Sequence, residues 1–79
     1  MITVEQIKRA QDAEELETLV SQALLERGFD FQLSDWDADA DAIEQDVLDG
    51  AVDPRQVEDL LRIVTILRAA EERRLKLQK

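Results

Sequence analysis

Apolar residues recur at helical spacing along most of the chain, and the clearest stripe begins after residue 13. Its members are Leu16, Leu19, Val20, Ala23 and Leu24. Intervals of three and four residues place these side chains on one face of an α-helix. The stripe stops at Arg27-Gly28, where a cation on the last turn and a glycine favour a helix end. We therefore predict a helix over residues 13–27.

A shorter stripe precedes this helix, formed by Val4, Ile7 and Ala10. Thr3 and Gln6 have the spacing of a capping box, in which the threonine oxygen accepts a backbone amide hydrogen and the glutamine reaches back. Asp12 and Glu15 repeat the same spacing. The two signatures predict either a break near residue 11 or a second helix start there, and they leave open whether the first two helices are continuous.

A third, narrower stripe consists of Trp36, Ala40, Ile43 and Val47. Ser34 with Asp37 has the spacing of a helix start, and Asp49-Gly50 marks the end. Between residues 28 and 34, apolar and polar residues alternate, which predicts a short extended connector. The only aromatic residues of the chain are Phe29, Phe31 and Trp36. We expect them to fill the core beside the helix ends.

The last helix has the clearest start. Asp53 is placed to cap it, Pro54 takes the first helical position and Gln56 completes the box. No breaker follows, so this helix can run for about 25 residues, or about 36 Å. The sequence thus predicts an all-α fold, a single domain over residues 1–79, built as a small bundle of three to four helices with a long C-terminal helix.

The apolar surface of the last helix is wider than a single core requires. One arc carries Val57, Leu60, Leu61 and Val64, and the adjoining second arc carries Ile63, Ile66, Leu67 and Ala70. Together they span roughly 220°, against about 100° or slightly more for a helix that faces one core. We expect the second arc to form a homodimer seam or a partner groove. The alternative is that the first helices wrap around the last one and bury it from both sides.

Charge is concentrated in one segment. Between Gly28 and Pro54 the chain carries nine acidic residues and no basic one, and this segment supplies the whole formal net charge of -9. In a helix, Asp37, Asp41 and Glu44 would line one flank of the apolar stripe, and Asp39 and Asp46 the other. Such a face is a solvated surface, a docking surface for a basic partner, or a complement to the basic C-terminal residues Arg73, Arg74 and Lys76.

A metal is a fourth possibility, because the aspartates that alternate from Asp35 are spaced like the ligands of a calcium loop. The pattern fails at Ala40, where that loop needs glycine, and at Asp46, where it needs glutamate. We therefore predict no specific metal site. A weaker response to divalent ions or low pH stays open, because crowded carboxylates disfavour their charged form.

Two separated stretches resemble a known family. Residues 12–16 (DAEEL), followed by residues 28–31 (GFDF), are similar to the helix-then-GFDF pattern of nitrogen-fixation-associated leader-peptide domains. The sequence contains no double glycine and no cysteine, which that family's cleavage site and modified tail would require. We draw no family assignment from the resemblance.

Catalysis is not expected. The chain lacks His, Cys and Tyr, which supply most proton transfer and nucleophilic attack near neutral pH. It has no Gly-rich phosphate loop, and we expect no cofactor. Residues 1–5 do not have the basic and apolar regions of a signal peptide, and the longest strongly apolar run, 63–67, is too short to span a bilayer. A cytoplasmic protein is the default expectation.

These observations favour a non-catalytic helical interaction protein, an adaptor, inhibitor or assembly factor with a regulatory role. It would act as a homodimer or bind a partner with a basic or apolar surface. The expected contact residues are Ile63, Ile66, Leu67 and Ala70 on the last helix, and Asp37, Asp39, Asp41, Glu44 and Asp46 on the third. Phosphates would be repelled, so we expect no direct nucleic-acid binding. The alternatives are a cation- or pH-responsive module using residues 35–46, and an acidic nucleic-acid mimic that blocks a basic site.

Overall fold

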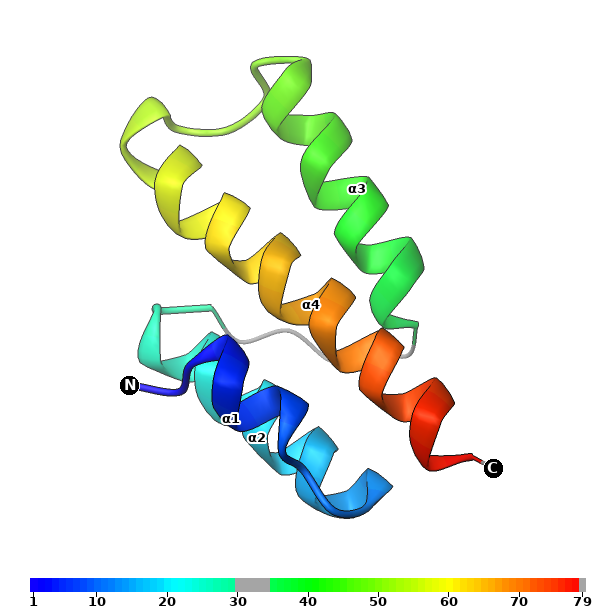
Figure 1. The fold of residues 1–79 in the computed structure, drawn as a ribbon. Helices are drawn as coiled ribbons and strands as arrows, with labels where there is room; N and C mark the ends of the chain where they lie inside the picture. Colours follow the sequence, from blue (N-terminus) through cyan, green and yellow to red (C-terminus); the bar gives the residue numbers. More distant parts are fainter. Residues whose placement is uncertain (30–34, 79) are drawn as a thin grey trace.

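The computed structural model describes residues 1–29 and 35–78, and within them the chain is helical with no strand (Figure 1). The elements are α1 (Val4–Lys8), α2 (Ala13–Glu26), α3 (Trp36–Leu48), a 3₁₀ turn η1 (Pro54–Gln56) and α4 (Val57–Leu77). This confirms the predicted all-α bundle with a long C-terminal helix. The connector predicted over 29–33 lies outside the described residues except for Phe29, which packs against the core.

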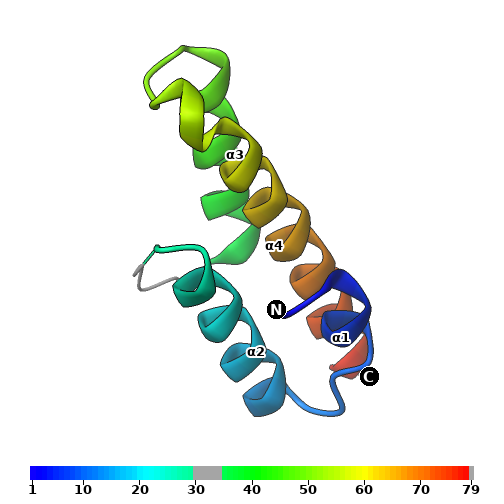
Figure 2. The same cartoon turned by 90° about the vertical axis from the view of Figure 1, so that its left-hand side faces the viewer.

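The helix starts follow local side-chain chemistry. Thr3 and Gln6 form the predicted capping box, with the Gln6 amide donating to Thr3 Oγ1 at 3.3 Å and the Thr3 amide to Gln6 Oε1 at 2.8 Å. Asp12 accepts from the Glu15 amide at 2.7 Å. A second cap four residues beyond Lys8 starts a new helix, so α1 and α2 are separate and form an antiparallel hairpin (Figure 2).

Two glycines end α2 and α3 in the same way. Gly28 has φ 82° and Gly50 has φ 72°, a left-handed conformation that glycine adopts without steric penalty. After Gly28, the Phe29 amide donates to the Leu24 carbonyl at 2.9 Å. After Gly50, the Ala51 amide donates to the Asp46 carbonyl at 2.9 Å. Both are Schellman closures, which satisfy carbonyls that the helix leaves without partners.

Two predicted starts differ in detail. The cap of α3 is Asp35, which accepts from the Ala38 amide at 3.2 Å, while Ser34 lies outside the described residues. Asp53 caps the last helical segment as predicted but accepts from the Arg55 amide at 2.9 Å instead of closing a box with Gln56. The first turn is consequently a 3₁₀ turn, and α4 proper has 21 residues.

Helix α4 is the centre of the molecule. Helix α3 runs antiparallel along one side of it, and α1 and α2 lie against the other side of its C-terminal half (Figures 1 and 2). Among the described elements, the most extensive packing is between α3 and α4. The fully buried large side chains of the core are Ile7, Leu16, Val20, Leu24, Ile63 and Leu67, and Trp36 is buried beside them.

The expectation that the second arc of the last helix lacks cover is wrong. Ile63, Leu67 and Ala70 have no exposed surface and Ile66 is 2% exposed. The cover comes from α1 and α2, which add Ile7, Leu16 and Val20 to the same core cluster. The wide apolar surface of α4 is therefore the surface of a helix that is packed on two sides.

Candidate functional site

The four apolar residues predicted to contact a partner are not accessible. Ile63, Ile66, Leu67 and Ala70 lie beneath α1 and α2. An isologous seam through these side chains would require the α1–α2 hairpin to move away from α4. The accessible part of the predicted site is therefore the acidic part.

The acidic residues of α3 fall into two groups. Asp37, Asp41 and Glu44 are spaced four and three residues apart, which puts them on one flank of the helix. We call this group the acidic flank. Asp39 and Asp46 lie on the other flank, as the sequence predicted; Asp46 is exposed and Asp39 is half-buried. One Asp39 oxygen, Oδ2, has no hydrogen-bond partner among the described residues.

The acidic flank converges on a single cation, Arg68 of α4. Its guanidinium lies 2.9 Å from Asp41 Oδ1, 3.4 Å from Asp37 Oδ1 and 3.5 Å from Glu44 Oε2. The hydrogen bond that Arg68 donates to Asp41 raises the pKa of Arg68 above its already high ordinary value, so this cation stays charged at every physiological pH. Three carboxylates share one guanidinium, and the flank keeps a formal charge of -2.

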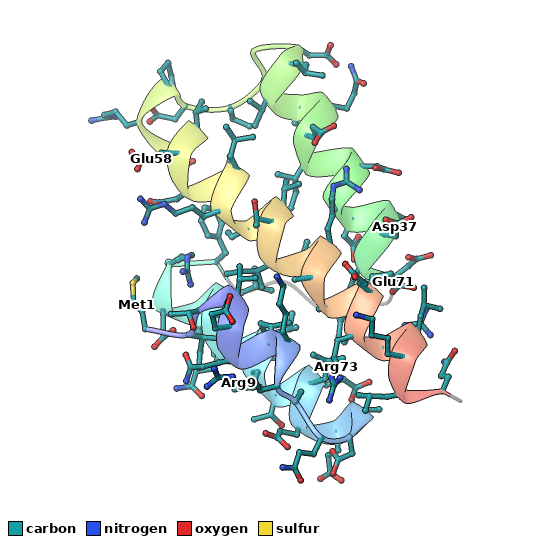
Figure 3. All side chains as sticks on the ribbon, in the orientation of Figure 1. Met1, Arg9, Asp37, Glu58, Glu71 and Arg73 are labelled. Carbon is teal, nitrogen blue, oxygen red and sulfur yellow. The ribbon has the colours of Figure 1, made fainter. Side chains whose placement is uncertain are left out.

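Arg68 is the residue that sequence reasoning missed. The sequence offered Arg73, Arg74 and Lys76 as the complement of the acidic helix. Within the chain these cations have nearer partners: Arg73 Nε donates to the Ala10 carbonyl at 2.8 Å, Arg74 pairs with Glu71 and Lys76 pairs with Glu72 at 3.5 Å. The hydrogen bond with Glu71, and to a smaller extent the charge of Asp35 at the start of α3, raise the pKa of Arg74. Figure 3 shows Asp37 on α3 and Arg73 reaching the opposite way, toward the α1–α2 connection.

A signal for Arg68 was present in the sequence. Arg68 interrupts the apolar surface of α4 between Leu67 and Ala69, on the side of the first arc that faces α3. A cation at the edge of a helix–helix contact is placed to reach acids on the neighbouring helix. The sequence could not give the register of the two helices, which decides which acids it reaches.

A shallow hollow between α1 and α4 collects basic residues. Lys8, Arg73 and Lys76 line it together with Ala69 and Glu72. Lys8 and Lys76 belong to the last turns of their helices, where positive charge compensates the free carbonyls. Arg73 instead donates to the carbonyl of Ala10, just beyond the end of α1. These positions account for the cations as elements of the fold.

The calcium-loop pattern does not form a loop. Residues 36–48 are helical, and side chains two residues apart in a helix point about 200° away from each other. Alternating aspartates are thereby separated onto opposite flanks. Across the part of the chain that the structure describes, no group of three or more His, Cys, Asp or Glu side chains is arranged to hold a metal ion.

Comparison of the chain with protein-family models, curated proteins and solved structures finds no match. Within residues 1–29 and 35–78, no helix combines the length and the apolar character needed to cross a membrane.

Proposed function

We propose that this chain is a non-catalytic interaction module that presents the acidic flank of α3 to a basic surface of a partner protein. The observation that carries the proposal is the geometry of Asp37, Asp41 and Glu44 around Arg68. Two negative charges of this group have no counterion within it. Cations of a partner would supply the missing charge.

The arrangement suits recognition more than stability. The three carboxylates are half-exposed to exposed, with side-chain accessibilities of 49–67%, and solvent-exposed pairs contribute about 0–1 kcal/mol each. Such charges mainly raise the association rate and select partners of opposite charge. Arg68 holds the carboxylates close together before any partner arrives, which lowers the entropic cost of ordering them.

Other classes of function have less support. The absence of His, Cys and Tyr argues against acid–base or nucleophilic catalysis. A negatively charged flank repels nucleic-acid phosphates. A homodimer through the second arc of α4 would first have to expose side chains that are buried.

A synthetic peptide tests the proposal directly. The probe is an Ala-rich helix of 18 residues with lysines at positions i, i+4 and i+7 and with glutamine at its other exposed positions. Fluorescence anisotropy at low salt should show binding to the wild-type protein, and added salt should weaken it. Asp37→Asn, Asp41→Asn and Glu44→Gln together should weaken binding about tenfold or more.

The matched control removes the same charge elsewhere. Glu5, Glu14 and Glu17 lie exposed on α1 and α2, and their replacement by glutamine should change the affinity less than about twofold. Equal weakening by both triple variants would mean that the peptide senses only net charge, which would contradict the proposal. Failure of the wild-type protein to bind would also contradict it.

A further inference from the structure

Two exposed leucines continue the line of the acidic flank. Leu48 on α3 is 74% exposed and Leu61 on α4 is 43% exposed. Leu48 comes seven residues after Asp41, and Leu61 comes seven residues before Arg68. Seven residues are almost two full helical turns, so each leucine lies on the same side of its helix as the charged residue it follows or precedes.

The pairing of the helices brings these leucines to the same place. The contact of 2.9 Å between Arg68 and Asp41 fixes the register of α3 against α4. The two helices are antiparallel (Figure 1). Two turns from Asp41 toward the C-terminus of α3, and two turns from Arg68 toward the N-terminus of α4, therefore lead to the same end of the helix pair. Leu48 and Leu61 therefore lie on one side of the α3–α4 hairpin, near its connection.

We propose that the acidic flank and these two leucines form one docking strip for an amphipathic basic helix of another protein. The strip comprises Asp37, Asp41, Glu44, Leu48 and Leu61. From Asp37 to Leu48 it is about 16 Å long, which is three helical turns. A partner helix would place lysine or arginine over the acidic end and a large apolar side chain over the leucine end. This inference rests on the proposed function and specifies its partner.

The strip combines apolar and charged side chains, and these two kinds of residue have different roles at protein interfaces. Binding energy concentrates in a few buried apolar or aromatic anchors, while charged positions around them steer and select. The leucine end can provide the anchor, because burying a leucine is favourable and exposing one is not. The acidic end can provide the steering, because its formal charge is -2 after pairing with Arg68.

A second copy of this chain fits the strip poorly. A two-fold axis through the middle of the strip would set the leucines of one chain against the carboxylates of the other. An axis at the leucine end would bury little more than the two leucines of each copy, far less than the roughly 800 Å² per partner of a stable interface. Both arrangements also bring together two chains of formal net charge -9. Positive charge must therefore come from a different protein.

Two versions of the lysine peptide separate this inference from the proposed function. In the second version, leucine replaces glutamine at the two positions that face Leu48 and Leu61. We expect this amphipathic peptide to bind the wild-type protein roughly tenfold more tightly than the polar peptide. Leu48→Gln with Leu61→Gln should remove that gain and leave the polar peptide's affinity unchanged. Leu25→Gln is the control, because this exposed leucine lies on α2, away from the strip, and it should leave the gain in place.

The possible results distinguish the docking strip from the proposed function on which it rests. Equal affinity of both peptides for the wild-type protein would overturn the docking strip and leave the acidic flank as the binding surface. Loss of binding by both peptides would overturn the proposed function itself. Light scattering adds a third test: a wild-type dimer that Leu48→Gln converts to monomer would show that a second copy occupies the strip. Circular dichroism checks that each variant remains folded.

Discussion

Two parts of α4 have different surroundings. The part from Ile63 onward lies between α3 on one side and α1 and α2 on the other, and Ile63, Leu67 and Ala70 are completely buried there. The first turns of α4, residues 57–62, extend with α3 beyond the α1–α2 hairpin (Figure 2). In these turns Leu61 is 43% exposed, and Leu60 is buried without belonging to the continuous core cluster.

This difference separates the apolar residues of α4 that stabilise the fold from those that are available for binding. An apolar pattern shows which positions benefit from cover, but the cover itself depends on where the other helices end. Helices α1 and α2 are short and cover one side of α4 from Ile63 onward. They leave open the first turns of α4, with Leu61, and the side of the α3–α4 pair where the acidic flank meets Arg68. The surface suited to a partner is therefore the part of the α3–α4 pair that the small N-terminal hairpin does not cover.

The largest effect that tests this comparison comes from the part of α4 that α1 and α2 cover. Ile63→Ala removes a completely buried side chain and should lower the free energy of unfolding by about 2–5 kcal/mol. A domain of this size has roughly 3–5 kcal/mol in total, so the variant should be largely unfolded. Leu61→Ala should cost less than about 1 kcal/mol, since much of that side chain is already in water. Urea denaturation followed by circular dichroism measures both.

Equal losses of unfolding free energy for Ile63→Ala and Leu61→Ala would show that the two parts of α4 are packed alike, and the comparison would fail. An unchanged slope of the free energy of unfolding against urea is the control, because it shows that both variants unfold from the same state.

Local features of the fold could be predicted from the sequence, and their relation in space could not. The capping residues Thr3, Asp12 and Asp53 and the glycine closures act over a few residues, so their spacing alone identifies them. Burial of Ile66 depends on helices far from it in the sequence, since it belongs to the core cluster that α1 and α2 complete. The candidate site, too, could be predicted from the sequence only in its local features. The flank positions of Asp37 and Asp41 follow from helical periodicity, whereas their pairing with Arg68 follows from the register of two helices.

A smaller effect is expected on the uncovered side of the α3–α4 pair, where Arg68 joins α4 to α3. Arg68→Gln leaves Asp37, Asp41 and Glu44 facing one another without a cation, so the melting temperature should fall by roughly a few degrees at low salt. Sodium chloride at about 0.5 M should largely restore it, because salt screens the remaining repulsion. Arg62→Gln is the control, because it breaks an exposed pair with Glu58 within α4 alone. A loss that persists at high salt would show that Arg68 acts by packing and not by charge.

The smallest effect is expected at the tip of the open hairpin, where Asp53 caps the last helical segment. Hydrogen bonds from the Arg55 side chain and amide hold the pKa of Asp53 below its usual value. A carboxylate whose pKa is lower in the folded state stabilises the protein above its unfolded pKa, about 3.9, and that contribution is lost as the pH falls through the folded pKa. Asp53→Asn keeps an acceptor at the cap and removes the charge. The wild type should melt slightly higher than this variant at pH 7, and the two should converge once the pH falls below the pKa of Asp53 in the folded state.

Asp59→Asn removes one charge from the first turn of α4 without touching the cap, and it should differ less from the wild type at neutral pH. A gap between the wild type and Asp53→Asn that stays constant as the pH is lowered would mean that the ionised carboxylate does not hold the tip, and that this end of the α3–α4 hairpin depends on its apolar contacts alone.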